Sequence, residues 1–401
     1  MPGPGWYLID DAEEAEVLSA MRERHLSRYR FEEQDAVSKT MLLERRMSDV
    51  LGSRHVLALN SCTSALVAGL TALGVGPGDE VIVPGYTFIA SIAAVLFTGA
   101  TPVLAEIDDS LTLDPADVGA KITDRTKAVL PVHMIGAPTD MDSLMALTSS
   151  AQIAVLEDCA QACGGSYRGR RLGTIGDLGA FSLNTGKTMT AGDGGLLTTD
   201  STPLYRKAFA FHDHGFAPDR AGLVDEGPCI GLNLRLHELA SAVGLAQARK
   251  LDDVLARCRV LKSVVRAGLA GLDGSRERVI HDEGECATAH VLIFDDATRA
   301  AATAAALDGH VLGASAKHNY ALMGQLHGEF AERVRHGRPG DLPRTDAILA
   351  RSLAFSVGVV DSYLGTLGAV TVLDTPQEAA AKTASVRKVI EDHGATATSR
   401  S

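Results

Sequence analysis

Three stretches of the sequence carry side chains that can do chemistry, and the first is the turn that holds Lys187. FSLNTGKTMTAGDGG runs from Phe181 to Gly195, between two predicted strands at residues 178–183 and 196–199. A primary amine on such a glycine-rich turn can be aimed at a carbonyl group and form a Schiff base with it. Gly186-Lys187-Thr188 looks like the end of a P-loop, but a P-loop has a glycine where this chain has Phe181. The turn therefore predicts either a lysine that is oriented toward a ligand or a lysine that is exposed to solvent. It does not predict a nucleotide-binding site.

The other two stretches also follow predicted strands. Asp158 and Gln161, in EDCAQ, come directly after the apolar run 153–157, and a buried carboxylate there needs a cation or hydrogen-bond donors. The alternative is an aspartate that caps the next turn. NSCTS, residues 60–64, lies between a predicted strand and a predicted helix, where free amides and hydroxyls suit a phosphate. The alternative there is an ordinary helix N-cap.

The elements that must position these stretches alternate along the chain. Short apolar runs separated by helical periodicity predict an α/β fold with a mostly parallel sheet that is covered on both faces. Strands are predicted at residues 55–60, 80–84, 102–105, 127–132, 153–157, 178–183, 196–199, 287–294 and 353–357. Helices are predicted at residues 11–24, 35–51, 63–73, 88–98, 141–148, 235–256 with a continuation to 269 after a kink, 297–307 and 376–392. We place a domain boundary near residue 255: residues 1–255 form an N-terminal arm and a large domain, and residues 256–401 a smaller α/β domain.

The three stretches are expected to meet, because open α/β sheets bind ligands beyond the carboxyl ends of their strands. A phosphate site, a carboxylate and an amine are what pyridoxal 5'-phosphate (PLP) requires. The phosphate anchors the cofactor, the carboxylate keeps the pyridine nitrogen protonated, and the lysine forms the Schiff base. The sequence therefore predicts a PLP site and no metal site.

Composition excludes several other classes of protein. The 401 residues carry a net charge of −12 with no basic stripe, which argues against nucleic acid as a partner. No apolar run is long enough to span a bilayer, and no N-terminal segment has the pattern of a signal peptide. The six cysteines are scattered, so reduced thiols are expected instead of disulfides or zinc. We expect a cytoplasmic protein that does not bind membranes.

Beyond these single features, the chain from about Trp6 to Leu251 resembles the DegT/DnrJ/StrS-type PLP-dependent sugar aminotransferases of fold type I, which have an aspartate-aminotransferase-like fold. The resemblance rests on the motifs NSCTSAL, GVGPGDEVIVPGYTF, PVHMIG, EDCAQACGG, FSLNTGKTMTAGDGG and GLNLRLHELASAVGLAQARKLD. It implies that Lys187 is the Schiff-base lysine and that Asp158 is the partner of the pyridinium nitrogen. It also implies a homodimer with shared active sites. The resemblance implies that Cys62, Thr63, Ser64 and Ser182 bind the phosphate of the cofactor. It implies that Phe88 stacks on the ring and that Gln161 lies beside the ring hydroxyl. It places Asn233, with Arg235 as a further candidate, in the segment that reaches the active site of the neighbouring subunit.

The resemblance implies an aminotransferase that moves an amino group from glutamate or glutamine to a keto sugar, often nucleotide-linked, or to a keto cyclitol. Two alternatives stay open. One is a PLP-dependent synthase or lyase similar to the aminohydroxybenzoate synthases, and the other is a non-catalytic, PLP-binding regulator. The chain departs from the family at Cys62, where a glycine is usual, at Asp193, where a glutamate is usual, and in its C-terminal third around Lys317 and His318. His133 and His214 lie in motif regions and receive no predicted role.

Overall fold

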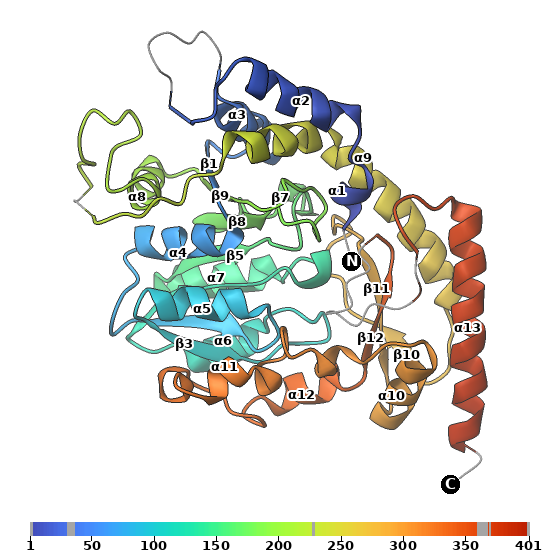
Figure 1. Ribbon diagram of the computed structural model, residues 1–401. Coiled ribbons are helices and arrows are strands. Elements are labelled where there is room, and N and C mark those ends of the chain that lie inside the picture. The colour runs from blue at the N-terminus through green and yellow to red at the C-terminus, as the bar shows by residue number, and fades with distance from the viewer. Residues whose placement is uncertain (1–2, 30–36, 227–228, 359–367, 369, 399–401) are drawn as a thin grey trace.

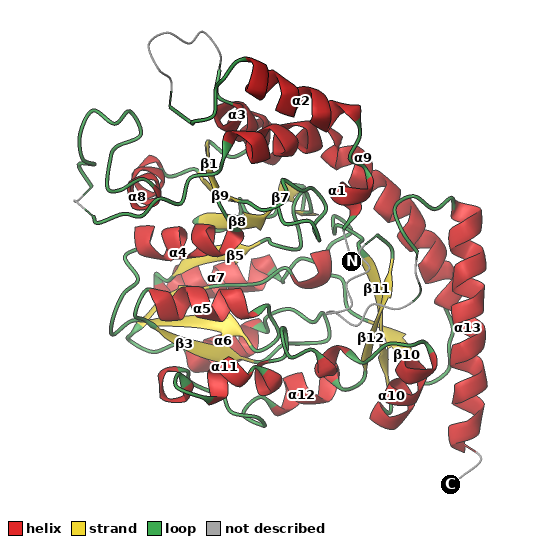
Figure 2. Cartoon of the chain, in the orientation of Figure 1, coloured by secondary structure: helices red, strands yellow, loops and turns green. Residues whose placement is uncertain are grey.

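A central, mostly parallel β-sheet between layers of helices organises the molecule (Figures 1 and 2). The computed structural model describes residues 3–29, 37–226, 229–358, 368 and 370–398. The strand order is β1-β9-β8-β5-β4-β2-β3; β9 runs antiparallel to both neighbours and the other four pairings are parallel. The strands are β1 (His55–Leu59), β2 (Glu80–Pro84), β3 (Thr101–Ala105), β4 (Thr126–Val129), β5 (Ala154–Asp158), β8 (Leu178–Ser182) and β9 (Gly195–Thr199). Each agrees with a predicted strand to within a few residues.

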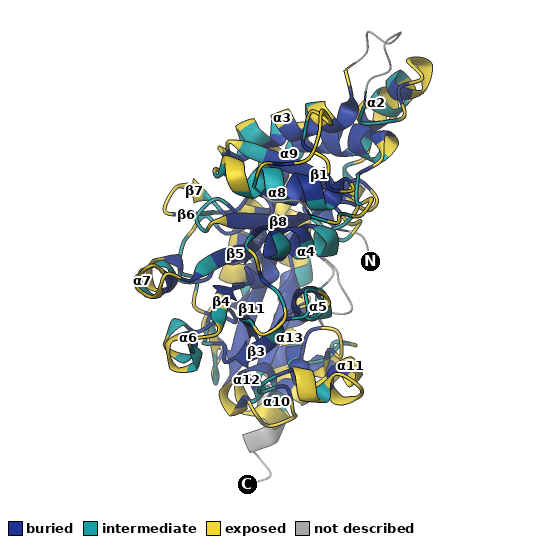
Figure 3. Ribbon diagram, turned by 90° about the vertical axis from the view of Figure 1, so that its left-hand side faces the viewer, coloured by how far each residue is buried: buried dark blue, intermediate teal, exposed yellow. Residues whose placement is uncertain are grey.

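Alternate residues of the strands pack into different hydrophobic cores on the two faces of the sheet. Leu57 and Leu59 of β1 pack on the face covered by α4 and α5, whereas Val56 and Ala58 pack on the face covered by α3 and α7. A strand that is buried on both faces reads as a continuous apolar run, which is why periodicity located these strands. Figure 3 shows the central strands in dark blue, with exposed residues on the outer sides of the helices.

The helices confirm most of the prediction and correct it in several places. Those that follow the predicted ranges are α2 (Asp11–Arg22), α3 (Lys39–Leu51), α4 (Cys62–Ala72), α5 (Ile89–Phe97), α7 (Met141–Ala151) and α10 (Ala297–Ala306). Residues 35 and 36 of the predicted helix 35–51 lie outside the described residues. The final helix, α13, runs over Pro376–Thr398 instead of ending at Asp392. The helices that the prediction omitted are α1 (Pro4–Tyr7), α6 (Pro115–Lys121), α8 (Thr202–His212), α11 (Gly324–His327) and α12 (Pro343–Leu349).

The long helix α9 (Glu238–Leu269) is continuous, so the predicted kink after residue 256 is wrong. Buried Leu255, Cys258 and Leu261 carry its apolar stripe across that point, and packing therefore holds one unbroken helix together. Its first half packs on α2 and α3 and its second half on α13, as Figure 1 shows.

The C-terminal third forms a second, antiparallel sheet with its own core. Its strands are β10 (Ser275–Glu277), β11 (Ala289–Phe294) and β12 (Ser352–Ser356), in the order β10-β11-β12. A separate hydrophobic cluster, drawn from residues 261–390, packs this sheet against α9 and α13. The short strands β6 (Ser166–Tyr167) and β7 (Arg170–Arg171) form a hairpin outside both sheets. The domain boundary near residue 255 falls within α9 and stays a prediction.

Candidate active site

A cavity of about 370 Å³ opens at the carboxyl ends of β5 and β8, beside the first turns of α4 and α5. Its wall brings together residues from every stretch that the sequence singled out. The predicted site residues that line it are Cys62, Thr63, Phe88, Asp158, Gln161, Ser182 and Lys187. Residues up to 125 positions apart in the sequence therefore face one space, as the rule for strand ends predicts.

Asp158, the last residue of β5, is a buried carboxylate with room for one more charged partner. Its Oδ2 accepts a hydrogen bond from the Ser91 hydroxyl at 2.8 Å, and its Oδ1 accepts one from the Ala160 amide at 2.9 Å. Burial raises the pKa of Asp158, whereas these two donors and the charge of Lys187 act in the opposite direction. Each carboxylate oxygen can accept a second hydrogen bond, so a cationic N–H in the cavity has an acceptor here.

Lys187 is half-buried on the turn after β8 and lines the same cavity. Its ammonium group makes no hydrogen bond or ion pair with the residues that the structure describes. Its charge acts on the pKa values of both Asp158 and Cys62, which places the amine near the two. The amine is therefore available to a ligand in the cavity.

The start of α4 is the predicted anion site and is called the anion cradle below. Ser61 is the N-cap, and its hydroxyl oxygen accepts from the Ser64 amide at 3.0 Å. Within the described part of the chain, the amides of Cys62 and Thr63 have no hydrogen-bond acceptor. The N-cap interpretation is confirmed, and the anion site stays a prediction that is compatible with it, because capping satisfies one amide and leaves two without an acceptor.

Gly195 lets β9 pass directly behind this cradle. A Cβ atom at Gly195 would lie 2.4 Å from the carbonyl carbon and oxygen of Ser61 and 2.5 Å from the Cys62 nitrogen. A side chain there would therefore displace the backbone that carries the free amides.

Phe88 and Gln161 also line the cavity. The Phe88 side chain is 43% exposed at the cavity, so it is not a core residue, and its ring centroid lies 5.5 Å from that of His318. The Gln161 side chain accepts a hydrogen bond from the Ile135 amide through Oε1, at 2.8 Å. An aromatic ring and an amide group therefore stand beside the carboxylate and the amine.

Two predicted residues lie away from the cavity. The Ser64 hydroxyl donates to Asn60 Oδ1 at 2.6 Å and does not line the wall. Asn233 is exposed and forms an isolated bridge with Asp213, whose carboxylate also pairs with the Arg235 guanidinium. In this one chain, Asn233 and Arg235 pair with Asp213 and do not line the wall of the cavity.

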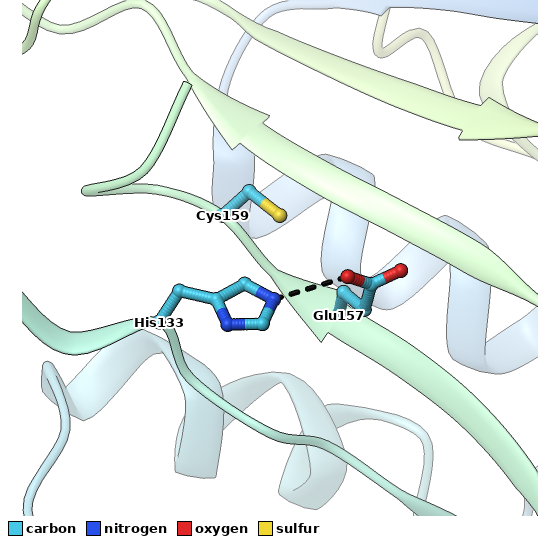
Figure 4. Close-up of side chains that lie close together, drawn as sticks. All are labelled: His133, Glu157 and Cys159. Atoms are coloured by element: carbon cyan, nitrogen blue, oxygen red, sulfur yellow. Dashed lines mark hydrogen bonds and ion pairs between the residues drawn. The ribbon is translucent and has the colours of Figure 1, made fainter. Parts of the chain in front are cut away.

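A cluster of His133, Glu157 and Cys159 lies buried at the end of β5 (Figure 4). His133 Nδ1 accepts from the Thr139 amide at 3.1 Å, which leaves Nε2–H to donate to Glu157 Oε2 at 3.0 Å. Glu157 also accepts from three backbone amides. Since these bonds use both imidazole nitrogens and both carboxylate oxygens, the cluster fixes the end of β5 and is not built to bind a metal ion.

Sequence reasoning missed several residues of the wall. Ser91 lies one turn along α5 from Phe88, but nothing in the sequence places its hydroxyl on a carboxylate 67 residues away. Among the others are Asn184, Asp193, Lys317 and His318. Lys317 and His318 reach the cavity because their carbonyls accept from the Ile89 and Thr87 amides, and this pairing is visible only in the fold.

Comparison with known proteins agrees with this geometry. A model of the DegT/DnrJ/EryC1/StrS aminotransferase family matches residues 11–359. The chain belongs to this family. Both the expected family and the expected fold type are therefore confirmed, and so is PLP as the cofactor of the family.

Individual relatives show how far the likeness extends. The chain is 41% identical over 214 residues to GDP-perosamine synthase of Caulobacter vibrioides, covering 53% of this chain and 57% of that protein. It is 41% identical over 210 residues to L-glutamine:2-deoxy-scyllo-inosose aminotransferase of Streptoalloteichus tenebrarius, covering 50% of each. The matched region thus spans about half of these curated relatives. A crystal structure of 3-amino-5-hydroxybenzoic acid synthase is similar over 98% of this chain and 99% of that chain, with a TM-score of 0.80 and 28% identity.

The wall of the cavity fits the cofactor of this family. The free amides of Cys62 and Thr63 and the hydroxyls of Thr63 and Ser182 suit the phosphate, and buried Asp158 suits a protonated pyridine nitrogen. The Lys187 amine completes the set that PLP chemistry needs. Cys62 adds a thiol whose pKa is raised well above its ordinary value by burial, so it stays neutral beside the phosphate.

Proposed function

We propose that the chain is a PLP-dependent aminotransferase that moves an amino group from glutamate or glutamine to a keto sugar or a keto cyclitol. One observation carries this proposal: an amine, a buried carboxylate and two free helix-start amides line one cavity. The names of the relatives support the class of acceptor, since they describe enzymes of sugar and cyclitol amination.

Four residues of the cavity have distinct roles in this proposal. When bound, PLP supplies a conjugated, electron-poor ring that accepts the electrons released when a C–H bond next to nitrogen breaks. Lys187 would hold the cofactor covalently, and its free amine would move the proton as base and then as acid. Asp158 keeps a positive charge at the pyridine nitrogen, and the Ser91 hydroxyl fixes the orientation of that carboxylate. Phe88 stacks on the ring and excludes water from one of its faces.

The proposal includes a homodimer in the cytoplasm. The segment with Asn233 carries exposed apolar side chains, with Ile230 95% and Leu232 54% exposed, and a second copy of the chain would cover them. The adjoining Leu234 carbonyl accepts from the Asn60 amide beside the anion cradle, so this surface adjoins the site. Among the described residues, no helix has both the length and the apolar character needed to cross a bilayer.

The decisive experiment loads the purified protein with PLP and adds glutamate or glutamine without an acceptor. We expect release of the donor's keto acid and a change in the visible absorbance as the cofactor takes up the amino group. Lys187→Ala removes the amine and Lys187→Arg keeps only the charge, so both should lose the lysine-bound absorbance and turnover. Full activity in Lys187→Ala would contradict the proposal.

A second candidate is a synthase like the 3-amino-5-hydroxybenzoate synthases, which the structural similarity over nearly the whole chain favours. The same experiment separates the two candidates. A synthase of this kind is indicated if no donor releases its keto acid while the PLP-loaded protein still converts a cyclic keto acid that already carries an amino group to an aromatic amine, with loss of water. An aminotransferase is indicated if labelled nitrogen passes from the donor to a keto sugar or keto cyclitol.

A further inference from the structure

A strained turn stands behind the cavity wall. Ile135, in the turn that follows β4, has φ 55° and ψ 38° and is 2% exposed. A β-branched residue rarely adopts this left-handed conformation, which persists only where the surroundings enforce it. The contacts of Ile135 should therefore reveal what enforces it.

Both backbone polar groups of Ile135 are held by side chains. Its amide donates to Gln161 Oε1 at 2.8 Å, and its carbonyl accepts from Arg278 Nη2 at 3.1 Å. Arg278 Nη1 donates to the carbonyl of Met134, also at 3.1 Å. One guanidinium group thus bridges two consecutive carbonyls, a geometry that a lysine cannot reproduce.

This turn decides which end of Gln161 faces the cavity. A backbone amide can only donate, so the group that receives the Ile135 N–H must be Oε1 and not Nε2. Gln161 lines the cavity with Asp158 and Lys187, and its Nε2 makes no hydrogen bond with any described residue. The group left for a ligand is therefore a donor.

Arg278 itself lies outside the cavity, in the C-terminal third of the chain. It directly follows β10, its amide donates to the Val291 carbonyl of β11 at 3.1 Å, and it is 4% exposed. Glu285 Oε2, 3.5 Å from Nη2, is the carboxylate that faces its charge. A buried arginine of the second sheet thus reaches the turn that orients a residue of the active site.

We propose that Arg278 is a positioning residue: it holds Ile135 in the left-handed conformation and so turns Gln161 Nε2 toward an acceptor oxygen of the bound ligand. The proposal rests on the proposed function in taking that ligand to be PLP, whose ring hydroxyl oxygen is the acceptor. Through this contact Arg278, which does not line the cavity, would favour the deprotonated form of the ring oxygen of PLP.

The test is a double-mutant cycle with Arg278→Met, Gln161→Ala and the double variant. The readouts are the dissociation constant of PLP, the pH midpoint of the visible absorbance of bound PLP, and urea unfolding of the PLP-free protein. Each single variant should weaken PLP binding about 5- to 10-fold, because each would remove one hydrogen bond to the cofactor. Each should also raise the pH midpoint, because a donor to the ring oxygen favours its deprotonated form. The double variant should match Gln161→Ala, since Arg278 acts through Gln161.

Two comparisons test whether the effect of Arg278→Met passes through Ile135. Arg259→Met is the control, because Arg259 also donates to two carbonyls, those of Gly284 and Glu285, and has no contact with Ile135. Ile135→Gly adopts the left-handed conformation without strain, so Arg278→Met should have a smaller effect on PLP binding in that background. Where Arg278→Met does not fold, Arg278→Lys, which keeps the buried charge and cannot bridge both carbonyls, takes its place.

Additive effects in the cycle, or a loss of stability with the pH midpoint unchanged, would overturn the role of Arg278 and leave the proposed function intact. Wild-type protein that binds no PLP would instead refute the proposed function, and this inference with it.

Discussion

Replacing Gly195 with alanine tests whether the start of α4 is an anion cradle. The new Cβ would lie 2.4 Å from two atoms of Ser61 and 2.5 Å from the Cys62 nitrogen, whereas ordinary contact begins at 3.4 Å. The atoms in question are backbone, so no side chain can rotate to make room. Either β9 or the first turn of α4 must move by about 1 Å, a displacement that can cost on the order of 100-fold in a site where geometry matters.

The expected magnitude follows from the hydrogen bonds that this shift disturbs. The free amides of Cys62 and Thr63 would each donate to a charged phosphate oxygen, and such bonds contribute about 1.5–3 kcal/mol each. Losing the alignment of one of them completely, or of both in part, costs about 3 kcal/mol. Since about 1.4 kcal/mol corresponds to a factor of ten, Gly195→Ala should bind PLP roughly 100-fold more weakly.

The assay is a titration of PLP-free protein with PLP, followed by absorbance, with urea unfolding measured separately. Gly186→Ala is the matched control: it lies next to Lys187, and its Cβ would meet nothing closer than Asn184 Oδ1 at 3.7 Å. We expect the control to bind PLP within about 3-fold of wild type, because that distance is ordinary contact. Equal PLP affinity in Gly195→Ala and Gly186→Ala, with both proteins folded, would refute the cradle.

Three further predictions follow from the described contacts. Asp158→Asn should lower turnover about 10²- to 10³-fold, as measured by keto acid release, because a neutral amide cannot stabilise the charged pyridine nitrogen; unchanged turnover would remove Asp158 from the mechanism. Ser91→Ala removes the donor to Asp158 Oδ2, so the pKa of Asp158 should rise further and the acidic limb of the pH–rate profile should move to higher pH; an unmoved limb would contradict this. Burial and neighbouring cations lower the pKa of His290 from 6.5 to about 3, so its contribution to stability is complete above pH 6.5 and is lost as the pH falls toward 3. Between pH 8 and 5 this loss is about 2 kcal/mol, and in urea unfolding His290→Leu should flatten the pH dependence by that amount, while the exposed control His327→Leu should not.

The centre of the candidate site was predictable because its parts depend on local patterns and one topological rule. The runs at β5 and β8 are apolar on both faces, so composition located them, and the rule for strand ends then placed Asp158 and Lys187 together. The first turn of α4 was predictable for the same reason, since the strand β1 and the helix after it are both strong local signals.

Other features depend on residues that are distant in the sequence, and no local pattern encodes them. The unbroken course of α9 past residue 256 depends on its packing against α13. The turn of Ser64 away from the cavity is instead a local contact with Asn60, four residues earlier, which the sequence analysis did not use. The omitted helix α6 begins with a proline after an aspartate cap, and the omitted helix α8 has a proline at its second position after a serine cap. Both signals were present in the sequence and were not used.

The sequence by itself determined the succession of the seven strands of the central sheet along the chain, most of the longer helices, the three reactive stretches and the family, because each of these lies within a short run of residues. The tertiary structure alone decided that Ser91 orients Asp158, that Gln161 offers its NH₂ group to the cavity, and that Arg278 holds Ile135 in a left-handed conformation. These are contacts between residues 26 to 143 positions apart. A hydrogen bond of that kind exists only once packing has fixed both backbones, so it can be observed in the fold but not inferred from the sequence.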